Sequence, residues 1–537
     1  MQPSDELARS LPTFKEWVPL TARVVILFVF AIIFQCSGGI YLASVSQMIG
    51  ATTLMHEDIM MAGYASFVGM AMVFPVLFPL KFRFTNRTIF ITVSIGFAAC
   101  NIISMNTHSQ VVLTGVCFIS GVLRMWGTFE CFSTLLLRIT PSRTFALFFC
   151  VIYSVILGSV QLSGIITVYL SYFYTWQYMH YFIIGLLLIV GLLSCLLLRP
   201  FRVQEALPLK GIDWLGGILW SVILLLLIFV FNYGEYYDWL DSFNIRAALI
   251  AALVLGVAHY FRMKRLRNPY IDMKIIHYPH LFTVLFLFTA MFVFLATPTV
   301  LQNVYTGAIL HFDSLHTISL NWAVLAGLLL GSMFTWLTLV RLHWKFKTMI
   351  FIGLALLVAN QVIFYFLISP DTSKEMLYLP LICRGAGNMI LYIVLTFYCS
   401  QVIPFSQMFQ ALAILGFIRN GIGTPMATAL VSRMLTVTHK ANYLSLSSEL
   451  DAQNQLVDHL SFNAIYGELQ RQSLLVSIKE IFGYVAIFGI LLLLAFLLTK
   501  YPPINKYVRM PVFSLPRRLR EIKLFRRPKY TVEELLK

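Results

Sequence analysis

The chain has 537 residues, of which 59% are hydrophobic and 12% are charged. A soluble globular protein carries roughly 25% charged residues and needs them to cover its surface, so this composition excludes a soluble fold and favours a membrane protein. The net charge of +16 is spread over short segments rather than gathered on a polar domain, so nucleic-acid binding is not expected.

Apolar runs long enough to cross a bilayer as helices recur along the whole chain. They are continuous rather than alternating, which excludes spanning β-strands. The sequence therefore predicts about fourteen transmembrane helices, at 22–42, 59–80, 88–106, 110–136, 145–170, 178–198, 214–233, 245–261, 281–301, 317–338, 347–368, 377–401, 407–431 and 481–499.

The distribution of Lys and Arg gives the orientation of these spans, because cytoplasmic loops are enriched in positive charge. With a cytoplasmic N-terminus, 30 of the 39 basic residues lie inside, and Lys81 is one of these loop residues. Six lie outside and three lie within spans. We therefore expect both termini in the cytoplasm and the protein in the cytoplasmic (inner) membrane.

Two long segments stand out between and after the spans. The outer segment 432–480 mixes leucines with polar residues, which predicts one or two amphipathic helices on the membrane surface or, alternatively, a plain solvated loop. The tail 500–537 is strongly basic and is expected to lie on anionic cytoplasmic lipid.

Signals for enzymes, cofactors and metals are missing from the sequence. The eight cysteines form no CxxC pair, and no phosphate-binding Gly-x-x-x-x-Gly-Lys motif or His-Glu-x-x-His motif occurs. His56, Glu57 and Asp58 form a short polar cluster, which is more typical of a solvated helix start than of a metal site. We expect no catalytic residue, no metal site and no cofactor.

Several short motifs recur in the order found in one family of transporters. The chain resembles the fourteen-span drug:proton antiporter branch (EmrB/QacA-like) of the major facilitator superfamily. The resemblance rests on Ile212-Asp213-Trp214-Leu215-Gly216, Asn268-Pro269-Tyr270-Ile271-Asp272-Met273, Gln302 with Gly307, Arg384-Gly385-Ala386-Gly387, Arg419-Asn420-Gly421-Ile422-Gly423-Thr424, Pro141-Ser142-Arg143 and Trp176-Gln177-Tyr178.

The resemblance implies an all-α major facilitator fold in which two six-helix bundles rock about a central site. The implied parts are a cytoplasmic segment 1–21, a first bundle 22–198, a linker with two inserted helices 199–280, a second bundle 281–499 and the cytoplasmic tail 500–537. The chain also departs from the family. The loop after the second span keeps only Arg83 and Arg87 of its basic gating motif, and Gln35-Cys36-Ser37-Gly38 stands where the first span of the family carries an aspartate.

Charged residues inside spans are costly and are kept mainly for function. Of the 23 Asp and Glu residues, only Glu130 lies clearly inside a predicted span, and it is our candidate for proton coupling. Burial favours a protonated carboxyl, a nearby cation favours the carboxylate, and alternating access can change this balance. A role in helix packing is the alternative.

Three arginines also lie inside spans and are candidate charge partners: Arg124, Arg384 and Arg419. Arg124 precedes Glu130 by six residues, about 9 Å along a helix, and the two point to different sides. A structural role, such as capping carbonyl groups, is the alternative for each arginine. Uncharged polar residues that could line a cavity are Gln35, Gln161, Gln302, Asn388 and Asn420.

The function expected from these features is secondary transport, with small amphipathic compounds exported in exchange for protons. Expected partners are the lipid bilayer, a small-molecule substrate and the proton. In a Gram-negative organism the resemblance adds a periplasmic adaptor and an outer-membrane channel. The alternatives are a facilitator or a lipid or siderophore exporter without proton coupling, and a membrane scaffold or sensor that transports nothing.

Overall fold

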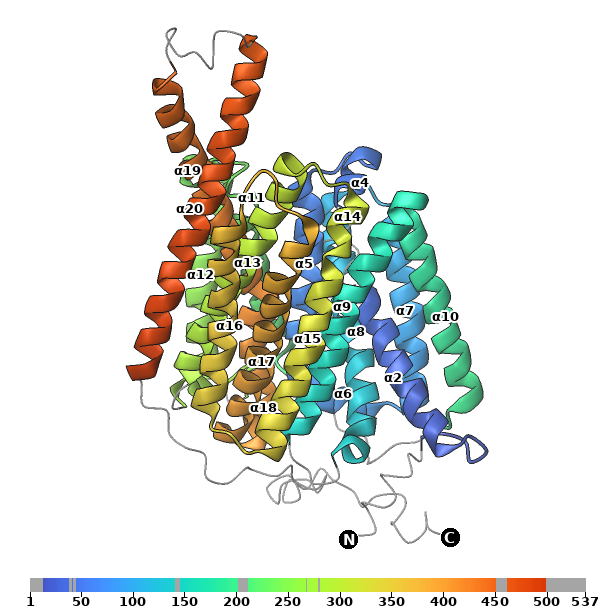
Figure 1. The fold of residues 1–537 in the computed structure, drawn as a ribbon. Coiled ribbons are helices and arrows are strands. Elements are labelled where there is room, and N and C mark those ends of the chain that lie inside the picture. The colour runs from blue at the N-terminus through green and yellow to red at the C-terminus, as the bar shows by residue number, and fades with distance from the viewer. Residues whose placement is uncertain are drawn as a thin grey trace.

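The computed structural model describes residues 13–37, 41, 45–140, 145–200, 211–266, 268–278, 281–450 and 461–498. This part of the chain is helical, and its only β-type pairing is an isolated bridge between Phe14 and Leu198. Figure 1 shows the helices packed side by side and running between two ends of the molecule. The predicted tail 500–537 and the first twelve residues lie outside the described part.

The first bundle contains the six predicted N-terminal spans. The second of them bends at a short 3-10 turn, η2 (Phe74–Val76), because Pro75 interrupts the helix, and then continues as α6. Its helices are α2 (Leu20–Cys36), α4 (Val45–Ala51), α5 (His56–Met72), α6 (Leu77–Arg83), α7 (Asn86–Asn106), α8 (Gln110–Ile139), α9 (Phe145–Phe173) and α10 (Gln177–Leu197).

Two inserted helices, α11 (Trp214–Tyr233) and α12 (Phe243–Arg265), follow the first bundle and are joined through η3 (Trp239–Asp241). They pack on each other, and α11 also packs against α5 and α19. The inserted pair therefore lies beside the junction of the two bundles.

The second bundle repeats the six-helix plan with longer, interrupted helices. The short turn η4 (Met273–His277) lies in the connection before it. The elements of the bundle are α13 (Leu281–Val304), η5 (Tyr305–Ile309), α14 (Ser314–Ser319), α15 (Asn321–Thr335), η6 (Trp336–Arg341), α16 (Phe346–Leu367), η7 (Lys374–Leu377), α17 (Tyr378–Val402), α18 (Phe405–Gly416), η8 (Phe417–Ile422), α19 (Gly423–Ser448) and α20 (Phe462–Leu498).

The number of spans agrees with the sequence. Twelve described helices are long and apolar enough to cross a membrane, and α2 is a shorter apolar helix. The elements α18, η8 and α19 follow one another without a break and form one further path across the bundle. The chain is thus a multi-pass membrane protein, and the predicted count of about fourteen spans is confirmed.

The segment 432–480 differs from its prediction. Its described parts are mainly helical, but α19 and α20 continue side by side away from the bundle instead of lying across its end (Figure 1). Asn442 of α19 donates hydrogen bonds to Ser477 Oγ at 3.0 Å and Glu480 Oε2 at 2.9 Å on α20. These contacts between the two helices hold the polar extension in a helical form.

Glycines bring the helices of the second bundle close together. A side chain on Gly385 of α17 would meet the backbone of α15 at Val324, and one on Gly387 would meet the backbone of α16 at Gly353. Small residues allow this close approach, which compensates for the lack of a hydrophobic driving force in lipid. The two glycines therefore let α17 pack tightly between α15 and α16. This packing fixes the direction of the neighbouring side chain of Arg384.

Two of the motif segments meet at the start of the inserted pair. Asp213 caps α11 by accepting a hydrogen bond from the Gly216 backbone at 3.0 Å, and its carboxylate forms an ion pair with Arg262 of α12. The Tyr270 backbone N–H also donates to Asp213, at 3.4 Å. The hydrogen bonds from Arg262, ahead of the other causes, lower the pKa of Asp213 below its usual value.

We predict that Asp213→Asn destabilises the protein at neutral pH but not at acid pH. Because the pKa of Asp213 is lower in the folded than in the unfolded state, its contribution is present above the unfolded value and is lost as pH falls through the folded value. Hydrogen bonds to a charged group contribute about 1.5–3 kcal/mol. Thermal unfolding in detergent at several pH values measures the difference. The exposed Asp241→Asn variant is the control, and an equal loss at every pH contradicts the prediction.

Candidate functional site

A buried ion pair joins two helices of the first bundle. Lys81 Nζ, near the end of α6, lies 3.0 Å from Glu130 Oε1 on α8, and the exposed fractions of the two side chains are 5% and 0%. Lys81 also donates to Ser133 Oγ at 2.7 Å, and Asn86 of α7 donates to the same carboxylate oxygen as Lys81. Glu130 is thus held by groups from two neighbouring helices.

The second carboxylate oxygen, Glu130 Oε2, is buried and has no hydrogen-bond partner among the described residues. An unpartnered buried oxygen is costly, because burial removes the hydrogen bonds that it would make with water. Among the described residues, hydrogen bonds therefore satisfy only one of the two oxygens of the Glu130 carboxylate.

The sequence missed Lys81 as a member of this site. Lys81 was expected in a loop after a span ending at residue 80, and Arg124 or Arg384 was expected to be the cation near Glu130. In the structure the helix continues past Lys81 to Arg83, and no carboxylate of the described residues lies within 4.0 Å of either arginine. The signal that could have shown this is the continued apolar pattern at Phe82 and Phe84.

The ion pair lies beside a contact between the two bundles. Phe78 of α6 and Phe129 of α8 both pack on Phe409 of α18, with ring centroids 4.2 Å and 5.8 Å away. Phe78 lies one helical turn before Lys81, and Phe129 directly precedes Glu130. We call Phe78, Phe129 and Phe409 the aromatic closure. It lies at the end of the bundle where α6 ends and α18 begins (Figure 1).

The Asn268–Met273 motif and the residues after it reinforce this closure. Tyr278 OH donates to Gln407 Oε1 of α18 at 2.9 Å, and the Asp272 backbone N–H donates to Gln410 Oε1 at 3.3 Å. Tyr270 OH donates to the Met72 carbonyl oxygen of α5. Residues 268–278 connect the two bundles, and they contact both of them at the end that carries the aromatic closure.

Arg124 is buried within the first bundle, 1% exposed. Its Nε donates to Gln35 Oε1 of α2 at 3.0 Å, and Gln35 Nε2 donates to Thr128 Oγ1 at 2.8 Å. The guanidinium lies 5.6 Å from the centroid of the Phe67 ring. Its Nη1 is buried with no hydrogen-bond partner in the described part of the chain.

Arg384 occupies the matching helix of the second bundle and is half-buried. Its Nη2 donates to Thr299 Oγ1 of α13 at 2.6 Å. One turn further along α17, Asn388 Oδ1 is buried without a partner among the described residues, and so is Gln302 Oε1, one turn from Thr299 on α13. The structure thus places Arg384, Asn388 and Gln302 on two adjacent helices.

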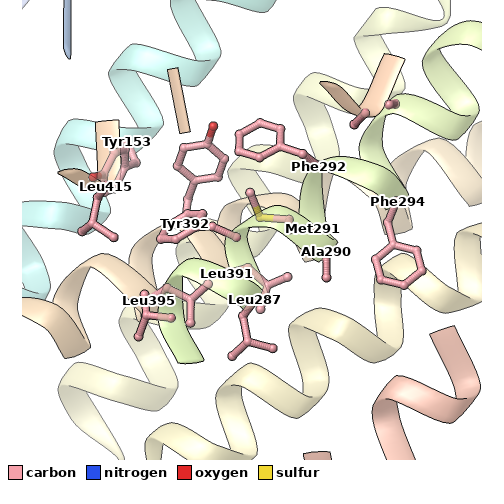
Figure 2. Packing of buried hydrophobic residues seen from close by; sticks show 14 of the residues in the cluster. Tyr153, Leu287, Ala290, Met291, Phe292, Phe294, Leu391, Tyr392, Leu395 and Leu415 are labelled. Carbon is pink, nitrogen blue, oxygen red and sulfur yellow. The ribbon is translucent and has the colours of Figure 1, made fainter. Parts of the chain in front are cut away.

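Arg419 lies in η8 and contacts both bundles. It donates to Tyr153 OH of α9, and its guanidinium lies 5.3 Å and 5.8 Å from the ring centroids of Tyr153 and Tyr392. Tyr153 OH in turn donates to Thr396 Oγ1 of α17 at 3.1 Å. Figure 2 shows Tyr153, Tyr392 and Phe292 in one packed cluster between the helices. Arg419 therefore joins the bundles through aromatic rings.

The remaining candidates are placed less centrally. Gln161 on α9 is half-buried, and the side chain of Asn420 lies outside the described part of the structure. Arg83 is exposed at the end of α6, and Arg87 on α7 is half-buried. No group of three His, Cys, Asp or Glu residues that could hold a metal ion occurs in the described segments.

Comparison with known proteins identifies the fold. The structure resembles a nucleoside transporter, NupG, with a TM-score of 0.53 and 12% identity over 88% of this chain and 99% of that chain. It also resembles the peptide transporter POT, with a TM-score of 0.54 and 14% identity over 92% of this chain and 98% of that chain. No family model and no curated protein sequence matches. The expected all-α fold of membrane-spanning helices is confirmed, and it resembles the fold of these solved transporters.

We predict that the stability effects of Lys81 and Glu130 are coupled. Removing one partner of a buried ion pair costs about 3–5 kcal/mol, because the other charge remains buried and uncompensated. Lys81→Met and Glu130→Gln should each lower the unfolding temperature in detergent, and the double variant should lose much less than their sum. The exposed Lys345→Met variant controls for loss of a lysine. Additive losses would show that the pair does not act as a unit.

Proposed function

We propose that this protein is a secondary transporter that works by alternating access and is coupled to protons through Glu130. The single observation that carries the proposal is the position of the Lys81–Glu130 pair directly beside the aromatic closure. The likeness to a nucleoside transporter and a peptide transporter supports the choice of transport over a scaffold role.

The geometry provides a physical route for coupling. The ion pair holds α6 against α8 and so keeps Phe78 in place on Phe409. If α6 moves away, Glu130 loses its cation while still buried, and protonation is then the less costly form. Proton uptake would accompany opening of this end, and proton release would accompany the return of Lys81.

The finer parts of the proposal follow from the sequence. The basic loops support a cytoplasmic position for this end, in an inner membrane and with both termini on the same side. The motif resemblance favours export of small amphipathic compounds in exchange for protons. The projecting α19–α20 hairpin would then face outward, and it offers a helical surface to a periplasmic adaptor and outer-membrane channel in a Gram-negative cell.

Efflux from proteoliposomes tests this function. The purified protein is reconstituted with a panel of anionic, cationic and neutral amphipathic dyes, and release is followed with and without a pH gradient. We expect gradient-driven release of at least one dye and a loss of at least tenfold in Glu130→Gln, because this variant cannot exchange a proton.

The exposed Glu449→Gln variant is the matched control and should behave as the unchanged protein. If the rate of dye release is the same with and without the gradient and is unchanged in Glu130→Gln, the protein is a facilitator and the proposed proton coupling is wrong. Release of no dye under any condition would favour the scaffold or sensor.

A further inference from the structure

The two bundles carry equivalent arginines. Arg124 lies on the fourth spanning helix of the first bundle and Arg384 on the fourth of the second. Each donates to a polar side chain on the first helix of its own bundle, Gln35 at 3.0 Å and Thr299 at 2.6 Å.

Both arginines are also distant from the helix ends on the side of the aromatic closure. Arg124 precedes the end of α8 at Ile139 by about 22 Å, and Arg384 precedes the end of α17 at Val402 by about 27 Å, at 1.5 Å per residue. Both helices end on the side of the aromatic closure. Both arginines therefore lie far from the end of the molecule that carries the aromatic closure.

Neither arginine pairs with a carboxylate in the described part of the chain. Among the described residues, no carboxylate lies within 4.0 Å of Arg124 or Arg384, and Glu130 already pairs with Lys81. Arg124 is 1% exposed and its Nη1 has no acceptor there. A purely structural arginine at such a site would be expected to use all of its donors, because an unpaired buried guanidinium nitrogen is costly.

The surroundings of Arg384 add neutral polar atoms. Asn388 Oδ1 and Gln302 Oε1 are buried and have no partner in the described residues. These oxygens could accept hydrogen bonds from hydroxyl or amine groups. The interior thus offers cations and neutral amides, a composition that disfavours a cationic ligand.

We propose that the transported substrate is an organic anion whose oxyanion group, a carboxylate or phosphate, is bound by Arg124 from one bundle and Arg384 from the other. A guanidinium group matches the geometry of either oxyanion with two parallel hydrogen bonds. A ligand held by both bundles favours the arrangement in which they approach each other. This inference rests on the proposed transport function and narrows its substrate class.

The test compares two dyes in the same proteoliposomes. We expect release of carboxyfluorescein, an anion, and no release of rhodamine 6G, a cation. Carboxyfluorescein release should fall at least tenfold in Arg124→Gln and in Arg384→Gln and less in Arg124→Lys, which keeps the charge. The exposed Arg246→Gln variant is the control. Competition by benzoate but not phenyl phosphate, or the reverse, identifies the oxyanion, and benzyl alcohol should not compete.

The outcomes separate this inference from the transport function. Release of rhodamine 6G without carboxyfluorescein, or release that survives both Arg→Gln variants, overturns the anion site and leaves transport standing. If neither dye moves under any gradient, the transport function fails and the anion site fails with it. Size-exclusion profiles and unfolding temperatures confirm that each variant is folded, and Arg384→Gln, at a half-buried position, remains a test if Arg124→Gln does not fold.

Discussion

A charge inside the hydrocarbon layer must be paired or hydrogen-bonded, and the Lys81–Glu130 pair meets this requirement at the point where two bundles touch. Lys81 belongs to a helix that also supplies Phe78 to the aromatic closure, and Glu130 follows Phe129 of the same closure. The electrostatic state of one buried carboxylate is therefore linked to the packing that closes one end of the molecule. In the proposed mechanism, motion of the bundles and movement of a proton would be one process.

The three arginines inside the spans differ in their contacts. Arg419 joins the bundles through the rings of Tyr153 and Tyr392. Arg124 and Arg384 lie in separate bundles, and each is oriented by a polar side chain of the first helix. The proposed anion would bind both arginines and so connect the two bundles. Phe409 connects the bundles in the aromatic closure. The proton site and the substrate site would then act through the same bundle movement while using different residues.

Hydropathy was sufficient for the fold but not for the site. The predicted span 214–233 coincides with α11, because the length of the apolar run alone determines where this helix begins and ends. The predicted span 481–499 is only the last part of α20, which begins at Phe462, because the polar half of that helix is stabilised by its neighbour α19 rather than by lipid. Glu130 could be found from its isolation among apolar residues. Its partner Lys81 was harder to find, because a lysine just beyond an apolar run normally lies in a loop. The apolar residues Phe82 and Phe84 indicate that the helix continues, but only tertiary packing shows that Lys81 meets Glu130.

The most direct test of the central claim measures the closure itself. Spin labels at Arg138→Cys, at the end of α8, and Lys345→Cys, before α16, report the separation of the two bundles at the closed end through pulsed electron resonance. Glu130→Gln mimics the protonated carboxyl and cannot hold Lys81 as an ion, so the account predicts that it shifts the distance distribution to longer values, as acidification does for the unchanged protein. A distribution that is the same in Glu130→Gln and at every pH would contradict the link between the buried pair and the opening of the bundles.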